Sequence, residues 1–246
     1  MKAFLKRLVN TTLGLAGVRL VHRDWGPRGF ASHLGGLPAA VKARISRIVD
    51  IGASDGKWTR ECAKVFPGAS YLLIDPLDEN EPALRALCGQ NPHYHYWMGA
   101  LGAKSGQLEL HVHGDQSSAF SSKEYGAIIR TVAMSTLDTL LAENLLGGIP
   151  DFIKLDVQGD ELDVLAGAEE ALKVASLVLI EVSFQRIYDT QPLADEVICF
   201  MRDHGYKILD LCSYAQRPLD GALCQADVLF AREATGCFSQ TGWSDR

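Results

Sequence analysis

Short apolar runs alternate with amphipathic segments along most of the chain. Continuous apolar runs of about 4–8 residues indicate strands buried on both faces, and apolar residues spaced three and four apart indicate helices. The pattern predicts strands at 45–51, 71–74, 93–98, 151–157, 177–182, 206–211 and 225–231, and helices at 57–66, 82–88, 137–145, 160–172 and 195–204. Such alternation predicts an α/β fold with a mostly parallel sheet and helices on both faces.

The segment from 107 to 134 departs from this rhythm. Leu108, Leu110 and Val112 alternate with polar residues, which predicts a half-buried strand over 107–113. A serine-rich polar loop follows at 114–122, and 131–134 is predicted to return as its partner strand. We therefore expect a small β insertion in the larger fold.

The last predicted strand follows its neighbour too closely for a helix to intervene. The connection contains the turn signal Arg217-Pro218-Leu219-Asp220-Gly221. Strands joined without a crossover run antiparallel. The last strand is therefore expected to be reversed.

The chain divides into three predicted parts: an N-terminal helical extension (1–44), the α/β domain (45–235) and a C-terminal tail (236–246). In the extension, Lys2, Lys6 and Arg7 precede an apolar stretch that faintly resembles a signal peptide. Polar residues interrupt that stretch and no clear cleavage site follows. We expect an amphipathic helix packed on the domain, with at most weak contact with a membrane surface.

Charge and cysteine content narrow the class of protein. The 246 residues include 24 Lys+Arg and 30 Asp+Glu, a formal net charge of −6, which argues against a broad nucleic-acid-binding face. The six cysteines form no CxxC pair, and no histidine pair completes a zinc pattern. We expect reduced thiols, a cytoplasmic protein and no metal site. The sequence does not decide between a monomer and a homo-oligomer.

A glycine turn follows the first predicted strand and opens the first helix. Gly52 and Gly56 allow the backbone to approach a ligand closely, and Asp75 ends the next strand, where a carboxylate can accept hydrogen bonds from ribose hydroxyls. The central glycine of a dinucleotide-binding turn is missing. Asp50 and Asp55 add negative charge, which suits the ammonium and sulfonium of S-adenosylmethionine better than a pyrophosphate. A capped strand-to-helix turn without a ligand is the alternative.

Four segments in order, 49–56, 100–102, Thr136-Leu137-Asp138 and 153–161, together resemble the FkbM family of S-adenosylmethionine-dependent methyltransferases. The resemblance covers roughly residues 48–231. Its most specific part is the K-x-D-x-x-G-x-E string from Lys154 to Glu161. The family usually has an acidic residue where this chain has Gln158.

The resemblance implies a Rossmann-like class I methyltransferase fold, with a seven-stranded sheet, and O-methylation of a small hydroxylated acceptor such as a sugar, glycolipid precursor or polyketide. It places the methionine end of the cofactor at the glycine turn, the ribose at Asp75 and the adenine near Ala100. The cofactor-binding residues expected are Asp50, Gly52, Ala53, Ser54, Asp55, Gly56, Asp75, Pro76, Ala100, Leu101 and Asp156.

Methyl transfer to an alcohol benefits from a base. Asp156, at the end of its strand, either activates or orients the acceptor or caps the following helix. Lys154 shares its side of the strand, and Glu181 is a charge within an apolar strand; each is a catalytic candidate or a member of a structural ion pair. The substrate-binding candidates are His113, Ser117 and Ser118.

Two rival functions remain on the sequence alone. A nicotinamide-dependent oxidoreductase can use the same sheet, although the missing glycine disfavours it. A non-catalytic scaffold that keeps the methyltransferase fold is the other.

Overall fold

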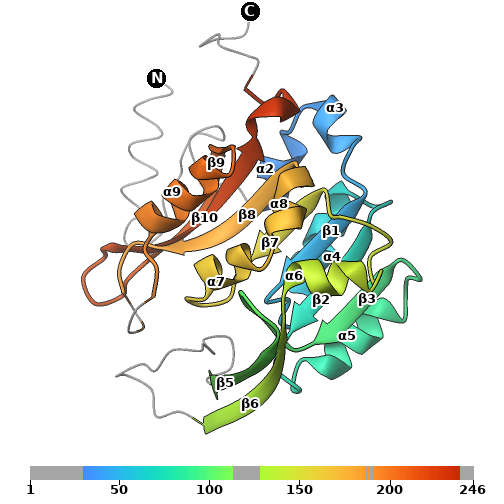
Figure 1. The fold of residues 1–246 in the computed structure, drawn as a ribbon. Helices are drawn as coiled ribbons and strands as arrows, with labels where there is room; N and C mark the ends of the chain where they lie inside the picture. The colour runs from blue at the N-terminus through green and yellow to red at the C-terminus, as the bar shows by residue number, and fades with distance from the viewer. Residues whose placement is uncertain (1–29, 113–127, 187, 189–190, 239–246) are drawn as a thin grey trace, which may run out of the picture.

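The computed structural model describes residues 30–112, 128–186, 188 and 191–238 (Figure 1). Its centre is a seven-stranded sheet in the order β3-β2-β1-β7-β8-β10-β9. The strands are β1 Arg47–Ile51, β2 Ser70–Asp75, β3 Tyr94–Met98, β7 Phe152–Leu155, β8 Leu177–Ser183, β9 Tyr206–Gln216 and β10 Leu223–Arg232. The first five are parallel to one another, and β10 runs antiparallel to both β8 and β9.

Alternate residues of each strand face opposite layers of helices. On one face, Ile48 and Tyr71 pack with residues of the helical layer such as Leu34 and Cys62. The helices of this layer are α2 Phe30–Gly35, α4 Lys57–Val65 and α5 Glu81–Cys88; the short α3, Ala39–Lys42, follows α2. Leu34 is fully buried here, so the end of the predicted N-terminal extension is part of the core.

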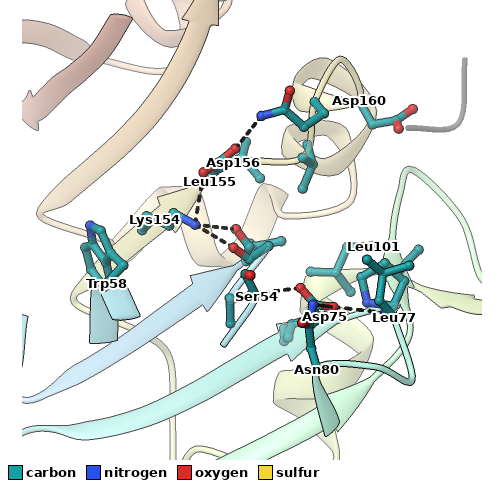
Figure 2. A pocket seen from close by; sticks show the side chains of 18 of the residues that line it. Ser54, Trp58, Asp75, Leu77, Asn80, Leu101, Lys154, Leu155, Asp156 and Asp160 are labelled. Carbon is teal, nitrogen blue, oxygen red and sulfur yellow. Dashed lines mark hydrogen bonds and ion pairs between the residues drawn. The ribbon is translucent and has the colours of Figure 1, made fainter. Parts of the chain in front are cut away.

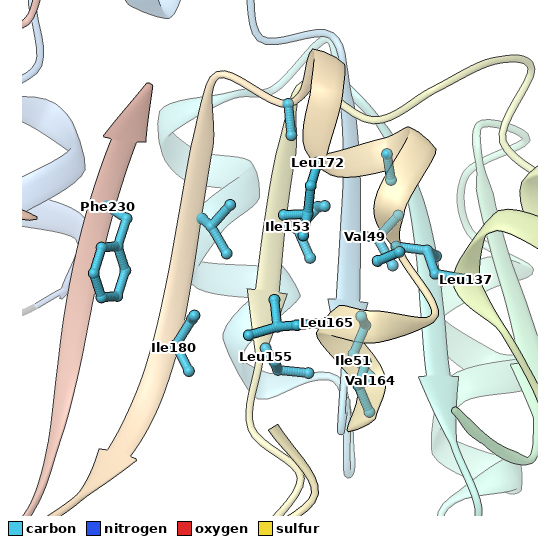
Figure 3. Packing of buried hydrophobic residues seen from close by; sticks show 14 of the residues in the cluster. Val49, Ile51, Leu137, Ile153, Leu155, Val164, Leu165, Leu172, Ile180 and Phe230 are labelled. Atoms are coloured by element: carbon cyan, nitrogen blue, oxygen red, sulfur yellow. The ribbon is translucent and has the colours of Figure 1, made fainter. Parts of the chain in front are cut away.

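The opposite face carries the larger apolar cluster (Figure 3). Val49, Ile153 and Ile180 of the sheet pack under Leu165 and Leu172. The covering helices are α6 Leu137–Ala142, α7 Glu161–Ala166, α8 Glu169–Val174 and α9 Ala194–Asp203. Burial on both faces explains why the central strands are continuous apolar runs.

The predicted single helix over 160–172 is wrong, because the chain breaks there into α7 and α8. A side chain at Gly167 would place its Cβ 2.1 Å from the carbonyl oxygen of Gly102. Beyond the break, the carboxylate of Asp138 accepts hydrogen bonds from the backbone N–H groups of Glu170 (2.8 Å) and Ala171 (3.0 Å). A distant side chain therefore caps the second helix.

The predicted β insertion is a three-stranded sheet of order β4-β6-β5. It comprises β4 Ala100–Leu101, β5 Gly106–Val112 and β6 Ile128–Ser135. Figure 1 shows it projecting beyond the carboxyl ends of the central strands. Within the described ranges, no helix is long and apolar enough to span a membrane.

Candidate active site

A cavity of about 650 Å³ opens at the carboxyl ends of β1, β2, β7 and β8. This is where open α/β sheets bind ligands. Figure 2 shows Trp58 and Lys154 at one end and Asp75, Leu77 and Leu101 at the other. The small sheet contributes Leu108 and Leu110 of β5 to the lining.

The turn after β1 is shaped by Gly52. Its φ of +73° is in the left-handed region, and a Cβ there would lie 1.8 Å from the carbonyl oxygen of Asp156. The backbone N–H groups of Gly52 and Ala53 both donate to the carbonyl of Ile74, at 2.9 and 3.0 Å. The turn is therefore held between β2 and the end of β7, and only glycine fits its first position.

Asp75 is almost fully buried and organises the next part of the wall. Its Oδ2 accepts a hydrogen bond from the backbone N–H of Ser54 at 2.8 Å. Its Oδ1 accepts from the backbone N–H of Leu77 (3.0 Å) and the side-chain amide of Asn80 (2.8 Å). A carboxylate offers about four acceptor positions, so one position stays available to a ligand hydroxyl.

Lys154 is buried below the cavity among oxygen atoms. Its ammonium donates to the carbonyl of Gly52 at 2.7 Å and lies 3.2 Å from Asp50 Oδ1 and 3.5 Å from Asp156 Oδ2. Burial alone would lower the pKa of Lys154, but the carboxylates of Asp50 and Asp156 raise it above its usual value. Lys154 therefore stays protonated and positions its neighbours.

Asp50 is fully buried and does not line the cavity. Besides Lys154, it binds Thr59, whose hydroxyl donates to Asp50 Oδ2 at 2.7 Å. Asp50 thus anchors Lys154 beneath the glycine turn, and this placement differs from the direct cofactor contact expected for it.

Three carboxyl groups lie close together in the wall of the cavity. Asp156, Glu181 and Asp227 all line it. Burial, together with the nearby carboxylates of Asp156 and Asp227, raises the pKa of Glu181 to about 8. Burial also raises the pKa of Asp227. Hydrogen bonds from Gln158 connect Asp156 (3.0 Å) with Glu181 (2.7 Å).

Glu161, the last residue of the K-x-D-x-x-G-x-E string, is buried beside this group. Its Oε1 accepts a hydrogen bond from the backbone N–H of Gly159 at 2.9 Å, and burial raises its pKa to about 7. Glu161 does not line the cavity. It fixes the loop that carries Gln158.

Comparison with known proteins decides the family. A family model described as the methyltransferase FkbM domain matches residues 50–208, more than half of the chain. The chain belongs to the FkbM methyltransferase family. Over 165 residues it is 27% identical to the 2-O-methyltransferase NoeI of Sinorhizobium fredii, a match that covers 58% of this chain and 66% of that protein.

A solved structure supports the fold. The methyltransferase FkbM from Methylobacillus flagellatus KT superposes with a TM-score of 0.52 at 18% identity, over 83% of this chain and 48% of the other. The chain thus matches less than two thirds of the length of each of these relatives. The Rossmann-like class I methyltransferase fold agrees with the prediction.

The FkbM domain brings most of the predicted site residues to one cavity. Gly56 joins Asp50 outside the lining; its φ is +79°, and a Cβ there would meet Leu87 Cδ2 at 2.7 Å. His113, Ser117 and Ser118 lie outside the described residues. The predicted residues that line the cavity are Gly52, Ala53, Ser54, Asp55, Asp75, Pro76, Ala100, Leu101, Lys154, Asp156 and Glu181.

Sequence reasoning missed several residues of this FkbM site. Asp227 lies in an apolar strand, as Glu181 does, and the same argument about a buried charge could have found it. Trp58 and Asn80 have no comparable signal, because their place depends on how α4 and the β2–α5 loop fold back over the sheet. In the part of the chain that the structure describes, no three His, Cys, Asp or Glu side chains are arranged so that they could hold a metal ion.

Proposed function

We propose that this FkbM protein is an S-adenosylmethionine-dependent O-methyltransferase that acts on a hydroxyl of a small molecule such as a sugar, a glycolipid precursor or a polyketide. The observation that carries the proposal is the cavity, where a glycine turn and several carboxylates meet at the carboxyl ends of β1, β2 and β7. The relative named as a 2-O-methyltransferase supports transfer to oxygen.

The residues of the cavity fit this cofactor. Gly52 lets the turn pack directly against the Asp156 carbonyl, where a Cβ would lie 1.8 Å away, and this packing fixes the backbone that lines the cavity. Asp75 would bind the ribose hydroxyls, and the apolar side chains of Leu77 and Leu101 would contact the adenine. The carboxylates of Asp55 and Asp156 would attract the two positive groups of the cofactor.

The cofactor, when bound, supplies an activated methyl group, and the protein supplies position and electrostatics. Lys154 holds both the carbonyl of Gly52 and the carboxylate of Asp156. One buried ammonium therefore positions both the glycine turn, where the cofactor would bind, and Asp156, on the side where the acceptor would bind. Because well-oriented reactants react far faster than free ones, this rigidity contributes to the rate.

The acceptor side of the cavity favours an uncharged substrate. Trp58 and Leu179 form apolar wall, and three carboxyl groups lie beside them. The ammonium of Lys154 is already bound to Asp50 and Asp156. Among the described residues of the lining, the other cation, Lys57, is exposed. A phosphate or carboxylate on the acceptor would meet like charge beside the three carboxyl groups, whereas hydroxyl groups can hydrogen-bond to them.

A nicotinamide-dependent oxidoreductase stays the alternative on this type of sheet. Asp55 lines the cavity at the turn, where its negative charge would repel a pyrophosphate. Thermal-shift titration with each cofactor separates the two functions, because only the correct one raises the melting temperature by mass action.

The proposal is tested by mass spectrometry after incubation with cofactor carrying a deuterated methyl group. The acceptors are paired glycosides and polyols, each neutral or with an added phosphate or carboxylate. We expect one labelled methyl group on a hydroxyl of a neutral acceptor. Labelling at nitrogen or carbon, or only of anionic acceptors, would contradict the proposal.

A further inference from the structure

Glu181 and Asp227 are directly opposite each other on neighbouring strands. They are register partners in the antiparallel pair of β8 and β10, and both line the cavity. Opposed side chains of such a pair have Cβ atoms about 4.5–5.5 Å apart, where two like charges repel. The pair is therefore stabilised by a proton on one of its members.

The two oxygens of Glu181 have different surroundings. Its Oε2 accepts hydrogen bonds from two side-chain amides, Gln158 at 2.7 Å and Gln225 at 2.8 Å. Within the described part of the chain, Oε1 has no hydrogen-bond partner, although Glu181 lines the cavity. The amides hold the carboxyl group still and leave one oxygen for a ligand.

Both carboxylate oxygens of Asp156, the other candidate base, already have partners. Its Oδ1 accepts from Gln158 at 3.0 Å, and its Oδ2 lies 3.5 Å from the ammonium of Lys154. Both oxygens of Asp156 therefore have partners, whereas Glu181 keeps one oxygen for a ligand, although Asp156 is closer to the glycine turn.

We propose that Glu181 takes the proton of the acceptor hydroxyl. Asp227 is the carboxyl group opposite it, and Gln158 and Gln225 are its positioning residues. The inference rests on the proposed function. The O–H bond of the acceptor breaks and its proton bonds to Glu181 Oε1. The electron pair stays on the acceptor oxygen and would form the new bond to the methyl group of the cofactor, while the methyl–sulfur bond would break and S-adenosylhomocysteine would leave.

The ionisation of Glu181 suits this role. The charged groups that face it are Asp156 from the loop after β7, Asp227 from β10 and Glu161 from α7. Lys154 lies on the far side of Asp156, as its ion-pair partner. Burial and the carboxylates raise its pKa to about 8. A general base works best when its pKa is near the working pH, so turnover should rise as the pH increases through about 8.

The first test needs neither cofactor nor acceptor. Carbon-13 NMR of protein labelled at the glutamate side-chain carboxyl follows each group through a pH titration, and Glu181→Gln assigns the resonance. We expect a midpoint at least about two pH units above the ordinary value of about 4.3, and a lower midpoint in Asp227→Asn. A smaller rise, or a midpoint that Asp227→Asn leaves unchanged, would overturn the charge pairing.

The second test measures turnover with the neutral acceptor that the mass-spectrometric screen identifies. We expect Glu181→Gln to lower kcat by roughly 10²-fold or more and to remove the rise with pH, while the affinity for S-adenosylhomocysteine stays unchanged. Exposed Glu143→Gln is the matched control. A smaller loss of kcat would overturn the base assignment. If wild-type protein neither binds the cofactor nor labels any acceptor, the proposed function itself fails, whatever the NMR result.

Discussion

The acidic side chains at the carboxyl edge of the sheet differ in their partners, and each therefore has its own role. Asp50 is sealed under the turn with Thr59 and Lys154. Asp75 binds three N–H groups and faces the cavity. Glu181 keeps one oxygen toward the cavity. The sequence could predict that carboxylates cluster at this site. The separate role of each carboxylate could not be predicted, because it depends on contacts between distant segments.

At the residue scale, Asp75→Ala should weaken the binding of S-adenosylhomocysteine. Hydrogen bonds to a charged group contribute about 1.5–3 kcal/mol, so we expect a Kd raised roughly 10- to 100-fold. Isothermal titration calorimetry measures it, with exposed Asp78→Ala as control. Equal affinity of Asp75→Ala and wild type would show that Asp75 does not bind the ribose.

Lys154→Met should destabilise the protein, because it leaves the buried carboxylate of Asp50 without its cation. Breaking a buried ion pair typically costs about 3–5 kcal/mol, whereas replacing both members by apolar residues is often neutral. Urea denaturation of Lys154→Met and of the double variant with Asp50→Leu compares the two cases. We expect the double variant to be more stable than Lys154→Met. If the double variant is the less stable of the two, the loss does not come from an unpaired Asp50.

At the scale of elements, the glycine turn that follows β1 packs against the end of β7. Gly52→Ala would place a methyl group against the Asp156 carbonyl and force a left-handed φ on alanine. We expect a lower melting temperature together with weaker cofactor binding. Gly68→Ala is the matched control, because a Cβ there meets nothing within 4 Å. Differential scanning fluorimetry that finds both variants equally stable would show that the turn can shift.

Local pattern was sufficient to predict the strands and most helices, because each depends on apolar residues within a short segment. The break between α7 and α8 was missed, since its cause is the approach of Gly167 to Gly102, far away in the sequence. Strand β9 extends to Gln216, beyond the predicted 211, because the hairpin with β10 supplies pairing partners for polar residues as well. Long-range contacts of this kind leave no local signal.

At the scale of the whole molecule, buried carboxyl groups make stability depend on pH. The pKa values of Glu161, about 7, and Glu181, about 8, are both above their ordinary value of 4.5. The folded protein therefore binds more protons than the unfolded chain between about pH 4.5 and 8. Their stabilising contribution is complete below pH 4.5 and is lost as the pH rises through this window.

We therefore expect Glu181→Gln to flatten the fall in stability between pH 5 and pH 8. One such group changes the free energy of unfolding by at most about 1.4 kcal/mol per pH unit. Urea titrations at several pH values compare wild type, Glu181→Gln and the control Glu143→Gln. A wild-type slope retained in Glu181→Gln would mean that Glu181 ionises normally in the folded protein.

The net charge of −6 comes partly from acidic residues that line the cavity. Asp55, Asp75 and Asp156 line the cavity, as the position of each near a strand end had suggested, whereas Asp50 is buried beneath it. An acidic cavity attracts a cationic ligand. The charge balance, first an argument against nucleic-acid binding, therefore supports a positively charged cofactor.

Calorimetric titration of wild-type protein with S-adenosylmethionine and S-adenosylhomocysteine shows whether the cavity is a binding site for this cofactor. We expect saturable binding of both at one site per chain, weakened in Asp75→Ala and unchanged in Asp78→Ala. Absence of binding heat for both ligands, with no rise in melting temperature, would contradict this expectation.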